Sequence, residues 1–216
     1  MTSLRTEPYL TQVERWPAQG RHVLAQYDDD TVVVYQAYRP SIGEAAARDG
    51  RLGGGGFSFD RMSWIKPNFL WMMFRSGWGT KPDQEVTLAV TIRREGFDAI
   101  LAEAVHSGHV PEVYGEKSAW QEAVRRSAVR LQWDPDHAPG GTPVERHTMQ
   151  LGLRGRTLRR FAEEWTVAIE DLSPFVAAQR ENRLSHRHEA LVTPREDVYP
   201  VRDPAAAKRL GVAPWP

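Results

Sequence analysis

Four polar side chains occur in or beside segments that are otherwise apolar, where an apolar residue would cost less to bury. They are Gln36, Arg61, Arg75 and Gln150. A buried glutamine that leaves its amide donors or its carbonyl unpaired costs about 1–3 kcal/mol. Four such residues in one small domain therefore predict that they share a polar pocket and are not four separately buried polar groups.

Each of these residues also has an ordinary structural role open to it. Gln36 could bond a neighbouring loop, and Gln150 could simply face water. Arg75 could cap the carbonyl groups at the C-terminus of a helix. The residue types alone do not decide between these roles and a common pocket.

Aromatic residues concentrate in the same part of the chain and would suit a pocket wall. Trp64, Trp71 and Trp78 recur every seven residues, which predicts one helical stripe. We expect its middle member in the core and its two ends beside the pocket. An indole wall can stack on the flat π face of a nicotinamide, an adenine or another nucleobase.

The sequence lacks the residues or motifs that several common kinds of catalytic and metal-binding site require. The chain has no cysteine, which excludes a thiolate nucleophile, a disulfide framework and cysteine-ligated zinc. The glycine run at residues 53–56 has no following lysine and so does not match a phosphate-binding loop. His186 and His188 are two residues apart, which on a helix directs them away from each other. We therefore expect no metal.

The net charge and the hydropathy of the sequence limit the classes of partner that the protein can bind. Lys+Arg and Asp+Glu both number 28, so the net charge is zero. This excludes a nucleic-acid binder held by bulk charge but leaves a local basic face open. No stretch reaches the ~18 apolar residues of a membrane span, and residues 1–12 lack the apolar core of a signal peptide. We expect a cytoplasmic protein with no membrane partner.

The elements that must position these side chains follow from hydrophobic periodicity. β-Branched or alternating runs predict strands at residues 31–35, 84–92, 128–133 and 146–153. Helical spacing predicts helices at residues 42–48, 68–75, 96–105, 120–126 and 157–169, with another from Pro174. Proline and glycine predict a loop at residues 51–60 and a loop or a hairpin tip at residues 134–143.

Helices and strands are mixed without regular alternation, which favours an α+β fold over a doubly wound sheet. A length of 216 residues suits one domain. We expect a single compact domain over residues 1–216 with a core at about 17–200. A short N-terminal extension would precede this core, and a proline-rich tail from Thr193 would lie along the surface.

Six motifs follow one another in a distinctive order. They are YDD at 27–29, VYQAY at 34–38, RMSWIKP at 61–67, FLWMMFRSGWGT at 69–80, QWDP at 132–135 and QLGLRG at 150–155. In this order they strongly resemble the bacterial and fungal family called domain of unknown function 4291. The resemblance covers nearly the whole chain, and the family name implies no activity.

A second resemblance implies chemistry. YQAY at 35–38, Ile42 and DGRL at 49–52 are similar to the opening of ADP-ribosyltransferases of the DNA-modifying toxin type. That resemblance implies a split mixed β-sheet with flanking helices and NAD, the substrate, in a cleft between two small sheets. Gln36 takes the place of the histidine that contacts the nicotinamide ribose. The residues implied to contact NAD are Tyr35, Gln36, Tyr38, Arg61, Trp64 and Arg75.

The last catalytic strand of that superfamily carries a glutamate, which stabilises an oxocarbenium-like transition state. Here the alignment places Gln150 at that position, with Glu145 nearby, so the implied catalytic residues are Gln150, Glu145 and Gln36. A glutamine can hold the ribose but supplies no negative charge, and odd spacing places Glu145 on the other face of the strand. The residues implied to contact the acceptor are Asp136, His137 and Arg154.

The leading hypothesis is therefore an NAD-dependent ADP-ribosyltransferase-like enzyme that modifies a nucleobase or a protein acceptor. The alternative is a non-enzymatic module that binds nucleotides or single-stranded nucleic acid. It would use the same aromatic wall and a basic cluster that could equally be a solvated helix face, namely Arg154, Arg156, Arg159 and Arg160. The sequence leaves the acceptor and the oligomeric state open.

Overall fold

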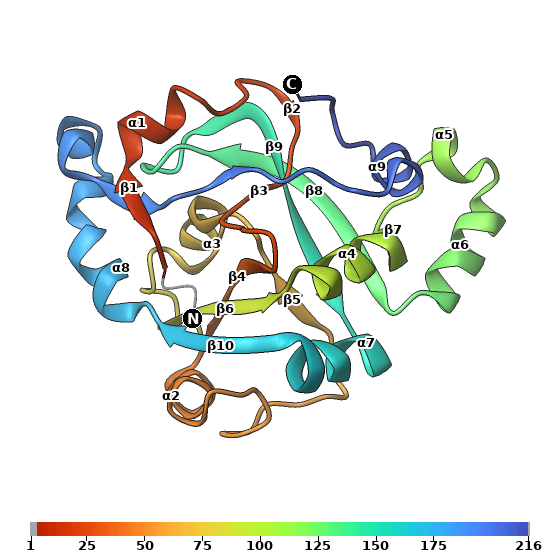
Figure 1. Ribbon diagram of the computed structural model, residues 1–216, viewed down its shortest axis with the longest axis horizontal. Coiled ribbons are helices and arrows are strands. Elements are labelled where there is room, and N and C mark those ends of the chain that lie inside the picture. Colours follow the sequence, from red (N-terminus) through yellow and green to blue (C-terminus); the bar gives the residue numbers. More distant parts are fainter. Residues whose placement is uncertain (1–3, 216) are drawn as a thin grey trace.

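The strands of the computed structural model, which describes residues 4–215, gather into two larger sheets that form a curled half-barrel (Figure 1). One sheet is antiparallel, in the order β10 (Thr166–Asp171), β6 (Val86–Arg93) and β4 (Thr31–Tyr38). The other contains β2 (Gly20–Arg21), β9 (Pro143–Leu153), β8 (Val129–His137) and β7 (Ala104–His106), and β5 (Ser63–Ile65) also pairs with β9. Two short pairs are β1 (Thr6–Pro8) with β11 (Val192–Pro194) and β3 (Leu24–Ala25) with β12 (Asp197–Val198).

Helices connect the strands of both sheets. They are α1 (Tyr9–Val13), α2 (Pro40–Asp49), α3 (Phe69–Ser76), α4 (Arg94–Glu103), α5 (Pro111–Tyr114), α6 (Lys117–Arg126), α7 (Gly155–Arg160), α8 (Ser173–Gln179) and α9 (Pro204–Leu210). A π-helical turn covers Phe161–Trp165, and 3₁₀ turns cover Glu181–Arg183 and Ser185–Ala190. This mixture confirms the predicted α+β class. Within residues 4–215, no helix has both the length and the apolar character needed to span a bilayer.

Strand β4 lies between the two hydrophobic cores of the molecule. Val32 and Val34 belong to the core that β4 and β6 share with the larger sheet. Val33 and Tyr35, which alternate with them, pack instead with α3 and α8. Burial of both faces explains why the strand reads as a continuous apolar run in the sequence.

The two larger sheets are joined at one point. β4 pairs with β6 along its whole length, whereas it meets the β5 segment through a single bridge, Tyr35 with Lys66. In that bridge each residue's amide donates to the other's carbonyl, at 2.7 and 3.0 Å. Beyond the bridge, within the described residues, no further backbone pairing holds β4 to β5, so the half-barrel splits there.

Local signals predicted the elements around this split. α2 starts at Pro40, and Gly50, which follows its last residue, has a φ of 64°, as expected for a glycine C-cap. α3 has an N-cap at Asn68, whose side chain accepts a hydrogen bond from the Trp71 amide at 2.7 Å. The predicted helices at residues 42–48 and 68–75 are therefore confirmed.

Three predicted elements are shorter than expected, because part of each pairs with a distant strand instead. The helix predicted at 96–105 ends at Glu103, because residues 104–106 pair with β8 as β7. The loop or hairpin tip predicted at 134–143 is a hairpin tip, but it is confined to residues 138–142, since β8 continues to His137 and β9 starts at Pro143. The helix predicted at 157–169 gives way to β10 at Thr166, which pairs with β6. In each case sheet pairing outweighs local helical or turn preference.

Two further expectations are corrected by the fold. The tryptophans do not form one helical stripe: Trp64 lies in β5, Trp71 in α3, and Trp78 follows the helix with a φ of 57°. The C-terminal segment does not lie wholly along the surface. Tyr199 and Leu210 are buried in the main core, because β11 and β12 pair with the N-terminal strands β1 and β3.

A buried ion pair ties the β8–β9 hairpin to the N-terminal segment. The Nε and Nη2 atoms of Arg146 donate to Asp136 Oδ2 at 2.9 and 2.5 Å, and its Nη1 atom donates to the carbonyl of Pro17 at 2.7 Å. Asp136 Oδ1 accepts from the His137 amide at 2.8 Å. Both charged groups are nearly inaccessible to solvent, so each depends on the other to remain buried.

We predict that Arg146→Met destabilises the protein by about 3–5 kcal/mol, because it leaves the Asp136 carboxylate buried without its partner. The control, Arg126→Met, removes an exposed pair with Glu122 and should cost less than about 1 kcal/mol. Urea unfolding of the two variants measures both values. Equal losses would contradict a structural role for the buried pair.

Candidate functional site

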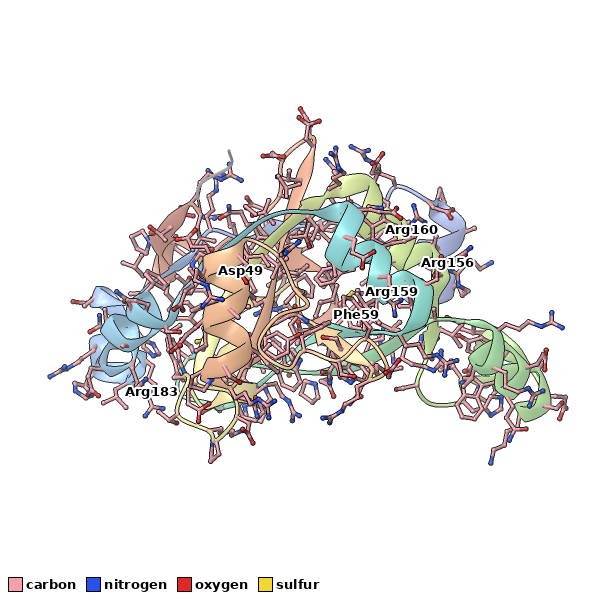
Figure 2. The ribbon with its side chains drawn as sticks, turned by 90° about the horizontal axis from the view of Figure 1, so that it is seen from below. Asp49, Phe59, Arg156, Arg159, Arg160 and Arg183 are labelled. Atoms are coloured by element: carbon pink, nitrogen blue, oxygen red, sulfur yellow. The ribbon has the colours of Figure 1, made fainter. Side chains whose placement is uncertain are left out.

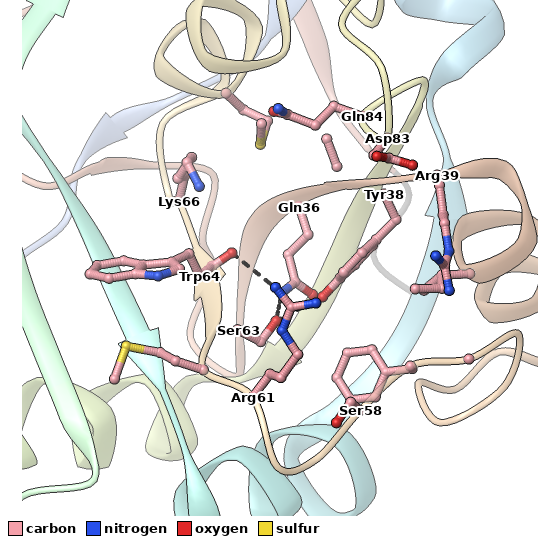
Figure 3. Close-up of a pocket in the computed structure, with 16 residues that line it drawn as sticks. Gln36, Tyr38, Arg39, Ser58, Arg61, Ser63, Trp64, Lys66, Asp83 and Gln84 are labelled. Atoms are coloured by element: carbon pink, nitrogen blue, oxygen red, sulfur yellow. Dashed lines mark hydrogen bonds between the residues drawn. The ribbon is translucent and has the colours of Figure 1, made fainter.

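A cavity of about 420 Å³ opens where β4 and β5 separate (Figure 3). Its volume lies in the range of sites for small organic ligands. β4 contributes Gln36 and Tyr38, β5 contributes Ser63 and Trp64, and Lys66 follows directly on β5. The split in the half-barrel is therefore also the place where polar side chains converge.

Gln36 spans the gap between the two strands. Its Nε2 atom donates to Ser63 Oγ at 2.8 Å and to the carbonyl of Trp64 at 3.3 Å, as Figure 3 shows. Its Oε1 atom is buried and has no hydrogen-bond partner among residues 4–215. An unpaired buried acceptor is costly, so this carbonyl is suited to accept a hydrogen bond from a ligand.

Tyr38 extends the same network. Its hydroxyl lies 2.7 Å from Ser63 Oγ, which also accepts from Gln36. Burial raises the pKa of the Tyr38 hydroxyl to about 12, although Ser63 and Gln36 oppose this change. The phenol therefore stays protonated at neutral pH and can serve as a hydrogen-bond donor.

Trp64 forms one wall of the cavity because the opposing residue on β9 has no side chain. Trp64 is the register partner of Gly152. A Cβ atom at Gly152 would lie 3.0 Å from two indole carbons and 2.5 Å from the sulfur of Met62. Glycine is thus required for the indole to lie flat over the sheet, where it presents an aromatic surface to the cavity.

The cavity is lined by more cationic than anionic groups. Arg39, Arg61 and Lys66 line it, together with one carboxylate, that of Asp83. Neither arginine forms an ion pair within the part of the chain that the structure describes. Guanidinium groups bind carboxylates and phosphates through paired hydrogen bonds, so this lining favours an anionic ligand.

Sequence reasoning missed Lys66, which is only 6% exposed. Within residues 4–215 its Nζ atom has no hydrogen bond or ion pair. Burial, assisted by the nearby charge of Arg75 and opposed by the charge of Asp134, lowers the pKa of Lys66 to about 8. The available signal was a lysine inside an apolar motif, between Ile65 and Pro67.

A carboxylate was also missed beside Gln150. Asp134 on β8 accepts hydrogen bonds from Gln132 Nε2 at 2.7 Å and from Gln150 Nε2 at 2.9 Å. Gln150 is buried, so it does not face water, but it does not line the cavity either. Lys66 links the cavity to the Asp134–Gln150 pair, because it lines the cavity and the charge of Asp134 acts on its ammonium group.

Three other predicted residues lie away from the cavity. Tyr35 lies on the other face of β4, where it packs edge-on against Phe69 with ring centroids 5.5 Å apart. Arg75 is exposed, and its guanidinium lies 5.9 Å from the centroid of the Trp71 ring. It does not cap α3; Lys81 does, by donating to the Arg75 carbonyl. Glu145 is exposed near the start of β9.

The residues predicted to contact an acceptor are not brought together at the cavity. Asp136 is engaged by Arg146. His137 stacks on Phe74, with centroids 3.6 Å apart and planes 16° apart. Arg154 donates to three carbonyls at the end of α6, including that of Ser127 at 3.0 Å.

The basic cluster on α7 is partly used within the fold (Figure 2). Arg159 lies 4.8 Å from the centroid of the Phe59 ring, and Arg160 pairs with Glu164 at 2.9 Å. Both contacts are compatible with an ordinary helix surface. Arg156 is exposed on the same helix.

We predict that Lys66→Met stabilises the protein at pH 7 by about 3 kcal/mol. The pKa of Lys66 is lowered from 10.5 to about 8 in the folded protein, and a pKa difference of one corresponds to about 1.36 kcal/mol. Because the unfolded chain binds this proton more tightly, the free energy of unfolding should rise between pH 8 and pH 10.5. That rise should be absent from the variant.

Urea unfolding at pH 7 and at pH 9.5 measures the effect. The control is Lys117→Met on α6, an exposed lysine whose replacement should change stability by less than about 0.5 kcal/mol at both pH values. A Lys66→Met variant less stable than the wild type at pH 7 would show that the ammonium has a stabilising partner.

Comparison with known proteins identifies a family. The family model described as "Domain of unknown function (DUF4291)" matches residues 22–199. No curated protein matches the chain. The matched region contains every residue that lines the cavity, and also Asp134 and Gln150. Since the match covers most of its length, the chain belongs to the DUF4291 family.

Proposed function

We propose that the protein is an NAD-dependent ADP-ribosyltransferase-like enzyme that transfers ADP-ribose to a nucleobase or a protein side chain. The observation that carries the proposal is the cavity at the split between β4 and β5. It combines guanidinium groups without ion-pair partners, an indole wall and the side-chain carbonyl of Gln36, which has no hydrogen-bond partner within the described residues. The resemblance of residues 35–52 to ADP-ribosyltransferases supports the same assignment.

The cavity offers a complementary group for each part of NAD. Arg61 and Arg39 suit the pyrophosphate, since a guanidinium binds two phosphate oxygens at once. The Trp64 indole suits stacking on the nicotinamide or adenine ring. Gln36 Oε1 can accept a hydrogen bond from a ribose hydroxyl, and Tyr38 can donate one.

The missing catalytic glutamate has a nearby substitute. When the bond between nicotinamide and ribose breaks, positive charge develops on the ribose, and a fixed negative charge would stabilise it. Gln150 is neutral, but its amide is bonded to the Asp134 carboxylate. We assign Asp134 as an electrostatic residue that acts on the ribose through space, as it does on the cavity residue Lys66. Gln150, which lies outside the cavity lining, would hold the Asp134 carboxylate in place.

The nucleic-acid alternative receives less support from the same structure. Three of the four arginines proposed to bind a strand are engaged within the fold: Arg154 by carbonyls, Arg159 by an aromatic ring and Arg160 by a carboxylate. A binding patch that holds a phosphate backbone needs guanidinium groups free to contact it. The proposal therefore remains with the cavity.

We predict that NAD binds the wild-type protein, that Arg61→Ala weakens binding at least tenfold and that Gln36→Ala weakens it by a smaller factor, roughly two- to tenfold. Loss of a charged hydrogen-bond partner such as Arg61 costs about 1.5–3 kcal/mol, and loss of a neutral one such as Gln36 costs about 0.5–1.5 kcal/mol. A difference of 1.4 kcal/mol is tenfold in affinity. Arg75→Ala should have a smaller effect, because Arg75 does not line the cavity. Isothermal titration calorimetry measures these affinities, with Arg156→Ala as the matched control.

Absence of NAD binding by the wild type would overturn the proposal. Salt-sensitive binding of single-stranded DNA or RNA, with no effect of NAD, would favour the non-enzymatic alternative. Equal weakening by Arg156→Ala and Arg61→Ala would show that the cavity is not the binding site.

We further predict that Asp134→Asn lowers kcat for nicotinamide release by roughly tenfold or more and leaves KM little changed, because the lost charge acts mainly on the transition state. Nicotinamide release is measured with a range of nucleic-acid and protein acceptors. Asp29→Asn, at an exposed site, is the control. A variant with unchanged kcat would remove Asp134 from the mechanism.

A further inference from the structure

Lys66 differs in its surroundings from every other lysine of the chain. The sequence contains four lysines, at positions 66, 81, 117 and 208. Lys81, Lys117 and Lys208 are exposed, whereas Lys66 is buried and lines the cavity. The protein therefore carries its own set of ordinary lysines against which this amine can be compared.

The charged groups around Lys66 do not neutralise it directly. Arg75 on α3 and Asp134 on β8 act on it through space in opposite directions. Within the cavity it shares the lining with Arg39, Arg61 and Asp83, and Tyr38, whose hydroxyl stays protonated, also lines it. An amine that is desolvated and close to another cation is more easily deprotonated and so becomes a nucleophile.

The lowered pKa of Lys66 greatly increases the fraction of its amine that is neutral at pH 7. With its pKa lowered to about 8, about a tenth of Lys66 is neutral at pH 7, compared with about one in three thousand for an amine of pKa 10.5. The neutral amine is the form that attacks a carbonyl carbon. The cavity gives it a confined space and two guanidinium groups that would hold an anionic reactant beside it.

We propose that Lys66 is a nucleophilic amine that forms an imine with anionic aldehydes, such as phosphorylated aldehydes and the open-chain forms of sugar phosphates. The lone pair of Nζ attacks the carbonyl carbon to give a carbinolamine. Loss of one water then leaves a carbon–nitrogen double bond. The nitrogen proton passes to solvent, and the departing hydroxyl takes a proton from solvent, so the step needs no oxidant or reductant.

Selectivity for anions follows from the lining. The arginines Arg39 and Arg61 would bind the phosphate group while the aldehyde reaches Nζ. This inference does not require NAD turnover. An aldehyde-reactive Lys66 would remain if the protein released no nicotinamide, and NAD binding through Arg61 would remain if Lys66 proved unreactive.

The test uses pyridoxal 5′-phosphate as the anionic aldehyde, with borohydride to reduce the imine to a stable secondary amine. Peptide mapping by mass spectrometry then gives the labelling rate of each lysine in the intact wild-type protein. We expect Lys66 to be labelled at least tenfold faster than Lys81, Lys117 or Lys208 at pH 7. The rate should rise toward a plateau above about pH 8, where the amine is mostly neutral.

Two comparisons test the origin of the selectivity. Pyridoxal, which lacks the phosphate, should label Lys66 more slowly than pyridoxal 5′-phosphate does, and Arg61→Ala should reduce that difference. Lys66→Arg should abolish the fast phase, whereas Lys117→Arg should leave it unchanged. Labelling of wild-type Lys66 no faster than the three exposed lysines would overturn the proposal, and this result needs no variant.

Discussion

The single bridge between Tyr35 and Lys66 is the constraint on which the site depends. Two backbone hydrogen bonds join β4 to the β5 segment there, and β4 is held along its length by β6 on its other edge. β5 in turn pairs with β9. Because each strand is committed to a different neighbour, the two separate beyond the bridge, and the gap is filled by side chains instead of a backbone ladder.

That separation accounts for the chemistry of the cavity. Where β4 and β5 have no backbone hydrogen bonds, the side-chain amide of Gln36 bonds across the gap to Ser63. The side-chain carbonyl of Gln36 is left without a hydrogen-bond partner among the described residues. Trp64 can lie over the sheet because Gly152 leaves it room. Lys66, at the bridge itself, is buried by the strands that meet there. The features that we assign to ligand binding are therefore consequences of one interruption in the sheet.

Two buried cationic side chains, Arg146 and Lys66, have different roles in this fold. Arg146 is paired with Asp136 and tied to Pro17, so its charge holds the β8–β9 hairpin to the N-terminal segment. Lys66 has no such partner within the described residues, and burial acts against its charged form. A paired buried charge contributes to structure, whereas an unpaired charge that lines a cavity is available to a ligand.

The sequence by itself determined the α+β class, the valine strand, the helix α2 with its glycine cap, the helix α3, and several cavity residues, among them Gln36, Arg61 and Trp64. These follow from local signals such as caps, β-branched runs and polar residues in apolar segments. Tertiary structure decided that residues 166–171 form a strand, that Tyr199 is buried, and that Lys66 and Asp134 belong near Gln150. Those outcomes depend on which strands pair and which charges meet, and neither is encoded within a short stretch of chain.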